Sequence, residues 1–138
     1  MKNRTHGFYG FLFFAVVSQA LAAGLAGTSM WSGQYGYSTG QASVPFTLTL
    51  HVAADGSFTG LTTEPATFGN GSSKALTADV SGSINGRRIY FKKTYDSSGG
   101  QTHTVEYSGM LSADGHTMSG TWKVDTQTGS FSAELVST

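Results

Sequence analysis

The 138-residue sequence contains no cysteine and few charged residues, which make up only 12% of the chain. The absence of cysteine excludes disulfides, thiolate metal sites and thiol nucleophiles. Acidic and basic residues balance to a formal net charge of zero, so the basic excess typical of proteins that bind nucleic acid or anionic membranes is missing. Beyond one apolar run near the N-terminus, the sequence also lacks the 3.6-residue hydrophobic periodicity of amphipathic helices.

The apolar run predicts a signal peptide over residues 1–22. Lys2 and Arg4 form a basic start, the run extends from Phe8 to Val17, and the small residues at 20–22 have the form of a cleavage site. The run is short for a membrane span, and an uncleaved anchor is the alternative. We therefore expect a secreted or periplasmic protein with no membrane attachment after cleavage, and about 116 residues remain for one domain.

After residues 23–30, which we expect to be a flexible lead-in, the hydrophobic pattern has period two. Apolar residues alternate with Thr, Ser and charged residues in several segments, including 46–52, 75–84, 102–111 and 129–135. This alternation is typical of strands with one buried and one solvated face.

Short turn sequences separate these segments, among them Asp55-Gly56, Asn85-Gly86 and Asp114-Gly115. Such dipeptides suit tight hairpins, so consecutive strands are expected to be antiparallel neighbours. The longer connection at 65–73 contains Phe68 and is expected to form a rim or lid. The sequence predicts a single domain over residues 31–138 with eight strands, at 31–37, 44–53, 57–64, 75–84, 88–95, 102–111, 117–124 and 129–135.

A bulky residue followed two positions later by glycine recurs in these strands. The five glycines that end this pattern are Gly33, Gly60, Gly82, Gly109 and Gly120. Each glycine shares a face with the bulky residue before it, and a tightly coiled sheet with a narrow interior needs such places without a side chain. The pattern predicts an all-β fold, an eight-stranded antiparallel up-and-down β-barrel, and favours it over a sandwich.

The order of strand motifs adds a resemblance. WSGQY opens the first strand, and DGSFTG, GSINGRRIYFKKTY, VEYSGML and MSGTWKV follow. In this the chain resembles the calycin group of barrels, which includes lipocalins, fatty-acid-binding proteins and avidins, and it is most similar to avidins. The resemblance implies a barrel that holds a small ligand in its lumen.

The biotin-contacting residues of avidin-like proteins are largely replaced. Gly33 and Tyr37 stand where an Asn and a Ser are expected, and His103 and Val105 stand where a Ser/Thr pair is expected. Tyr107 and Trp122 occupy positions that are Trp in avidin-like proteins, and the Asp near the C-terminus has no counterpart. These departures argue against biotin as the ligand, although the resemblance keeps biotin as an alternative.

Eight residues on the glycine face are the candidate ligand-binding set. Aromatic rings there either fill a small barrel or line a pocket, and the sequence leaves both open. The tyrosines favour a pocket, since a buried hydroxyl needs a partner. The set comprises Trp31, Tyr35, Tyr37, Phe91, Lys93, Tyr95, Tyr107 and Trp122.

Lys93 lies two residues from both Phe91 and Tyr95, so the period-two pattern places its side chain on the same inward face. An inward ammonium is costly unless it is paired, and barrels that bind carboxylates place a cation in this way. The alternative is that Lys93 extends out of the barrel mouth into water.

Nothing in the sequence indicates a metal, a cofactor or a catalytic site. The histidines have no metal-binding spacing, and Asp79 and Glu106 are both predicted to face outward, which argues against an acid/base pair. An enzyme is therefore not expected, although an isomerase or cyclase acting on a lipid-like substrate would need only one protonatable lumen group.

These observations favour an exported small-ligand-binding barrel that holds an apolar or amphipathic molecule, with Lys93 as a partner for an anionic group. The alternative is a barrel that binds a protein, as periplasmic protease inhibitors of similar shape do with an N-terminal arm, here residues 23–30. The polar outer faces favour a monomer, although avidin-like barrels associate through such faces.

Overall fold

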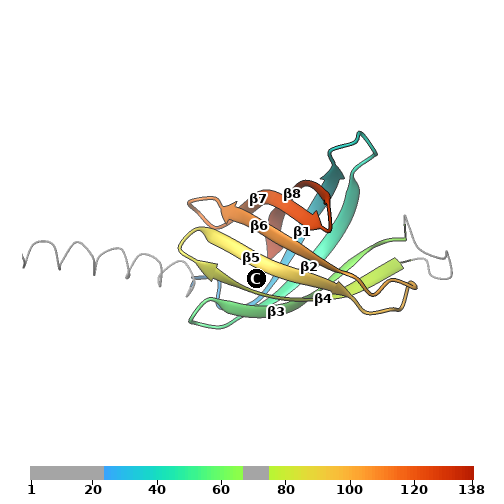
Figure 1. Cartoon of the computed structure of the whole chain (residues 1–138). Coiled ribbons are helices and arrows are strands. Elements are labelled where there is room, and N and C mark those ends of the chain that lie inside the picture. The colour runs from blue at the N-terminus through green and yellow to red at the C-terminus, as the bar shows by residue number, and fades with distance from the viewer. Residues whose placement is uncertain (1–23, 67–74) are drawn as a thin grey trace, which may run out of the picture.

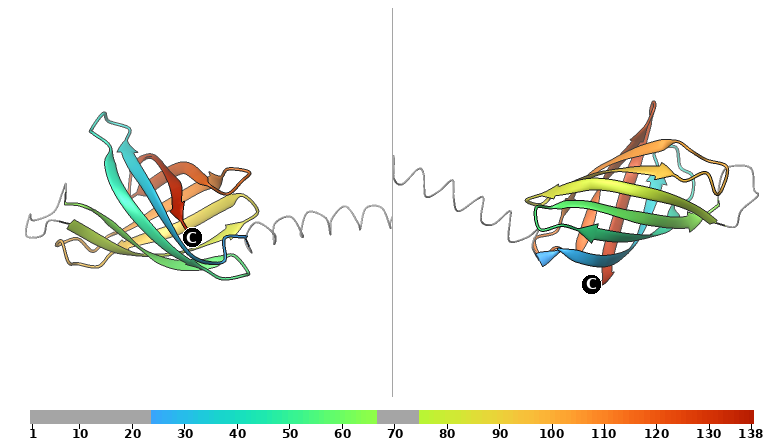
Figure 2. Two further views of the ribbon diagram at one scale, coloured as in Figure 1. Left: turned by 180° about the vertical axis from the view of Figure 1, so that it is seen from behind. Right: turned by 90° about the horizontal axis from the view of Figure 1, so that it is seen from below.

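The computed structural model describes residues 24–66 and 75–138. Within them eight strands in chain order form one closed antiparallel barrel, in which β8 pairs with β1 (Figures 1 and 2). This confirms the predicted all-β, up-and-down barrel. The expected signal peptide at 1–22 and the loop segment around Phe68 lie outside the described residues. The strands are β1 Gly27–Tyr37, β2 Val44–Val52, β3 Ser57–Pro65, β4 Ala75–Asn85, β5 Arg88–Tyr95, β6 Thr104–Leu111, β7 Thr117–Val124 and β8 Gln127–Ser137.

The apolar and polar residues that alternate in the sequence lie on the inner and outer faces of the barrel, respectively. In β2 and β5, apolar side chains and Lys93 point into the lumen and the residues between them face solvent, apart from a partly buried Thr49. The barrel closes where Tyr35 of β1 lies opposite Phe131 of β8. Side chains from all eight strands therefore meet in one core.

β1 begins at Gly27, four residues before the expected start at Trp31. Gly27–Met30 pairs with β2 and is therefore strand, not the flexible lead-in expected from the sequence. Leu25, just before the strand, is only 7% exposed and belongs to the core. Pairing and burial therefore place Leu25 and Gly27–Met30 in the barrel and not in a free arm.

The repeated glycines allow neighbouring strands to approach closely. A Cβ atom placed on Gly60, Gly82 or Gly120 would overlap a backbone carbonyl oxygen of the adjacent strand. Gly109 and Gly120 lie opposite one another on β6 and β7. These contacts agree with the expectation that the glycines permit tight coiling of the sheet.

The two ends of the barrel differ. At one end, called the base, lie the start of β1, the end of β8 and the connections at 53–56, 86–87 and 112–116. At the other, called the mouth, lie the connections at 38–43, 96–103 and 125–126, and the first of these projects beyond the barrel (Figure 1). In the described part of the chain no helix has the length and apolar character needed to cross a bilayer.

The lumen is packed toward the base. Phe91 contacts Phe58 and Phe131, with ring centroids 6.2 and 5.9 Å apart. Trp31 is 1% exposed, and its indole N–H donates a hydrogen bond to Ser29 at 2.9 Å. Aromatic and aliphatic side chains therefore close this half of the barrel.

Candidate functional site

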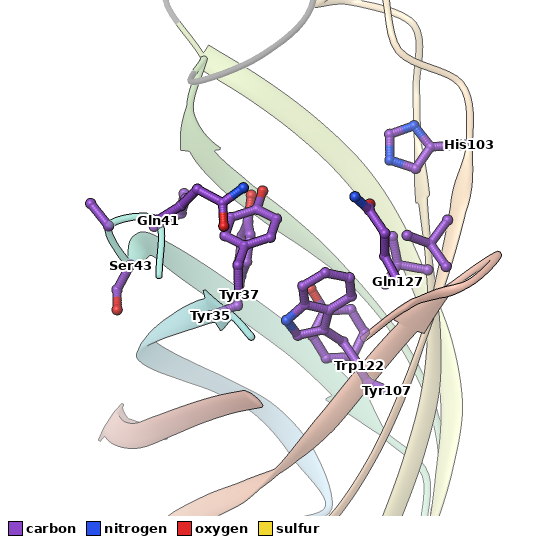
Figure 3. Close-up of a pocket in the computed structure, with 12 residues that line it drawn as sticks. Tyr35, Tyr37, Gln41, Ser43, His103, Tyr107, Trp122 and Gln127 are labelled. Carbon is purple, nitrogen blue, oxygen red and sulfur yellow. The ribbon is translucent and has the colours of Figure 1, made fainter. Parts of the chain in front are cut away.

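A pocket of about 550 Å³ opens at the mouth. We call it the mouth pocket. It extends down from the connection at 38–43 to the ring of Tyr107, and residues from β1, β2, β6, β7 and β8 contribute to it (Figure 3). Its lining is Tyr35, Tyr37, Gln41, Ala42, Ser43, Val44, His103, Val105, Tyr107, Trp122, Val124 and Gln127.

Three aromatic side chains form one wall of the mouth pocket. Tyr35 and Tyr37 both meet Trp122 edge to face, with ring centroids 6.2 and 5.4 Å apart. The indole N–H of Trp122 donates a hydrogen bond to the carbonyl oxygen of Gly36 at 2.8 Å. This bond joins β7 to β1 across the barrel closure, so the wall is held in one orientation.

Tyr107 lies between the filled base and the mouth pocket. Its ring stacks on Phe91 at 4.6 Å and meets Phe131 edge to face at 5.1 Å. Burial, together with the nearby charge of Glu64, raises the pKa of the Tyr107 phenol. Among the residues that the structure describes, the Tyr107 hydroxyl makes no hydrogen bond, and the residue lines the pocket. Tyr107 therefore adds a hydroxyl group to the pocket lining.

A buried polar cluster lies next to the pocket, centred on the Glu64 carboxylate. Lys93 Nζ lies 3.0 Å from Glu64 Oε1. The Tyr95 hydroxyl donates to the same oxygen at 2.7 Å, and the Tyr35 hydroxyl donates to Oε2 at 2.5 Å. The side chains of Lys93 and Glu64 are 2% and 0% exposed. An ammonium and two phenols thus satisfy a carboxylate that has no access to water.

The ammonium of Lys93 is also surrounded by aromatic rings. Its Nζ lies 4.7, 4.8 and 5.3 Å from the ring centroids of Tyr35, Tyr95 and Tyr107, within the range of cation–π attraction. Burial lowers the pKa of Lys93, and the adjacent Glu64 charge acts in the opposite direction. Lys93 therefore points into the barrel as its phase predicts, and it does not extend out of the mouth.

The structure divides the eight candidate ligand-binding residues into three groups. Four of them, Tyr35, Tyr37, Tyr107 and Trp122, line the mouth pocket. Two others, Lys93 and Tyr95, belong to the buried cluster behind it, to which Tyr35 also contributes through its hydrogen bond to Glu64. The remaining two, Trp31 and Phe91, are core residues. Both readings of the aromatic residues therefore hold, in different halves of the lumen.

Sequence reasoning missed Glu64, the partner of Lys93. The signal was present, because Phe58 and Gly60 set the inward phase of β3, and period two extends this phase through Thr62 to Glu64. It was overlooked because a charged residue at a strand end normally faces water.

His103 was also not among the candidates. It lines the pocket, and its ring centroid lies 4.7 Å from that of Tyr95. Burial and the charge of Lys93 lower the pKa of its imidazole, which favours the neutral ring. Within residues 24–66 and 75–138 no group of three metal-ligating side chains occurs.

The buried phenols make the fold sensitive to alkali. In the folded protein the pKa values of Tyr35, Tyr95 and Tyr107 are raised, and the largest cause is desolvation by burial. In the unfolded chain these phenols have a pKa of about 10. Their full contribution to the free energy of unfolding is therefore present below that pH. Above it the free energy of unfolding falls by up to about 1.4 kcal/mol per phenol per pH unit. Lys93, whose pKa is lowered by burial, contributes a change of opposite sign that ends at its unfolded pKa of about 10.4, so it does not offset the loss at higher pH.

We therefore expect three phenols to ionise only as the barrel unfolds. An alkaline titration followed by tyrosinate absorbance and circular dichroism should show three phenols ionising together with the loss of the folded circular dichroism signal. Ionisation of every phenol near pH 10 with unchanged circular dichroism would contradict the buried cluster.

No family model, no curated protein and no solved structure matches this chain, so the eight-stranded closed antiparallel barrel and the mouth pocket are the features from which its function is argued.

Proposed function

We propose that this chain is an exported barrel that binds a small apolar or amphipathic molecule in the mouth pocket. The observation that carries the proposal is the pocket itself. Its volume of about 550 Å³ falls within the range of roughly 300–1,000 Å³ found for ligand sites. Aromatic walls with a few polar groups are the usual lining of such sites.

Two features of the sequence support the wider setting. The basic start and apolar run of residues 1–22 support export to the periplasm or the outside of the cell. The closed eight-strand meander and the order of strand motifs support a place among the calycin barrels, with avidins as the nearest likeness. Biotin is not the ligand we propose, because Gly33, Tyr37 and Val105 differ from the avidin pattern.

The chemistry of the walls suggests the shape of the ligand. Trp122, Tyr35 and Tyr37 present edges and faces that suit a flat ring system. The Tyr107 hydroxyl offers a hydrogen bond deep in the pocket, and the His103 imidazole offers one nearer the rim. A planar molecule with one or two polar atoms satisfies both.

The first test is native mass spectrometry of the purified mature protein, followed by titration with N-phenyl-1-naphthylamine. This neutral aromatic probe fluoresces in apolar surroundings. We expect one probe to bind per barrel.

A variant with a large side chain in the pocket tests whether the probe binds there. Val105→Trp places a large ring in the pocket and should weaken binding at least about tenfold, or 1.4 kcal/mol. The control Thr104→Trp adds the same ring to the outer face, where residue 104 is exposed, and should bind as the wild type does. Absence of probe binding to the wild type, or equal binding to Val105→Trp, would overturn the proposal.

A further inference from the structure

The ion pair of Lys93 and Glu64 is closed to solvent and to the mouth pocket. Neither residue lines the pocket, and their side chains are 2% and 0% exposed. Lys93 Nζ nevertheless lies 4.7 Å from the ring centroid of Tyr35 and 5.3 Å from that of Tyr107, two of the pocket's lining residues. The charge is thus separated from the pocket by little more than one aromatic ring.

An unpaired cation in this place would act strongly on a ligand. Water is excluded from the cluster, so a charge is screened much less there than at a surface. The Glu64 carboxylate, 3.0 Å from the ammonium, supplies an equal and opposite charge. A ligand in the pocket is farther from both groups than they are from each other, so their electrostatic effects on the ligand largely cancel.

The other pocket groups do not restore a positive charge. Among the residues at 24–66 and 75–138 that line the pocket none is Lys or Arg, and the pKa of His103 is lowered by burial and by Lys93. A carboxylate ligand would lose its hydration without gaining a cation, which is costly. An uncharged polar atom loses less and can pair with the Tyr107 hydroxyl.

We propose that the mouth pocket selects uncharged ligands, and that Glu64 is the specificity-determining residue because it neutralises Lys93 beneath the pocket wall. This inference rests on the proposed ligand-binding function and names the class of ligand. It also replaces the sequence-based expectation that Lys93 pairs with an anionic ligand.

The test compares a neutral and an anionic probe of one skeleton. N-phenyl-1-naphthylamine is neutral, and 8-anilino-1-naphthalenesulfonate carries one negative charge on the same rings. The wild type should bind the neutral probe at least about tenfold more tightly. Glu64→Gln keeps the side-chain shape and leaves Lys93 without a counter-ion, so that a bound anion supplies the charge that keeps the buried ammonium protonated. The variant should bind the anion about tenfold more tightly than the wild type does.

Glu134→Gln is the matched control. It removes the same charge from the exposed face of β8, so it should leave the affinity for both probes unchanged. An unchanged affinity of folded Glu64→Gln for the anion, or an equal gain in Glu134→Gln, would overturn the inference. Failure of the wild type to bind the neutral probe would instead overturn the proposed function itself.

If Glu64→Gln does not fold, two further measurements test whether the pocket selects uncharged ligands. The double variant Lys93→Met/Glu64→Gln removes both charges and should keep the wild-type ratio of the two affinities. The cationic analogue N-(1-naphthyl)ethylenediamine should also bind the wild type more weakly than the neutral probe. Tighter binding of either ion than of the neutral probe would overturn the inference.

Discussion

Replacing Lys93 with methionine is expected to lower the free energy of unfolding by about 3–5 kcal/mol, because it leaves a buried carboxylate without its cation. Glu64 has no exposed surface, and only the hydroxyls of Tyr35 and Tyr95 would remain as its donors. Methionine fills nearly the same volume as the lysine stem, so a cavity contributes little. Urea denaturation of the wild type and the variant measures the difference.

A double-mutant cycle separates the pair from its surroundings. Glu64→Gln in the Lys93→Met background removes the uncompensated charge, while the glutamine carbonyl still accepts from one of the two phenols and its amide N–H can donate to the hydroxyl oxygen of the other. We expect the double variant to recover about 2–3 kcal/mol relative to Lys93→Met alone. Additive losses in the double variant would show that the two side chains are not coupled.

Replacing Gly120 with alanine is expected to lower the free energy of unfolding by about 3 kcal/mol, at the upper end of the range for overpacking. The new Cβ would overlap the carbonyl oxygen of Ser108 and press on the backbone of Gly109. A backbone group cannot rotate away as a flexible side chain does, so β6 and β7 would have to separate. Thermal and denaturant unfolding would show the loss.

Gly36→Ala provides the matched control. A Cβ on Gly36 would lie 3.6 and 3.7 Å from the hydroxyls of Ser43 and Ser130, which is ordinary contact distance. Its effect should stay within about 0.5 kcal/mol. Equal losses in both variants would mean that glycine matters for general strand flexibility and not for close approach between strands.

The strand pattern was predictable because each side chain's face depends on local geometry alone. Alternation placed all eight strands within a few residues of their observed bounds, and the glycine pattern favoured barrel closure. The prediction differed most at the N-terminus, where Gly27–Met30 is strand. Small and polar residues there carry a weak signal, and pairing with β2 orders them.

The candidate site was predictable only in part. Period two placed Tyr35, Tyr37, Tyr107 and Trp122 on the lumen face, and these residues line the mouth pocket. The same rule placed Trp31 and Phe91 on that face, but they pack toward the base. Height along the barrel axis separates the two sets, and it depends on register between strands, which no single strand encodes.

The sequence by itself determined the fold class, the strand order and the inward face, since these follow from alternation, turns and glycine spacing. Only the tertiary structure decided which half of the lumen is filled and which charge lies beside Lys93. Glu64 and Lys93 are 29 residues apart in the chain, and they meet because β3 and β5 flank β4 in one strongly curved sheet. Curvature brings inward side chains of non-adjacent strands into contact, and a pattern read along one strand contains no information about that contact.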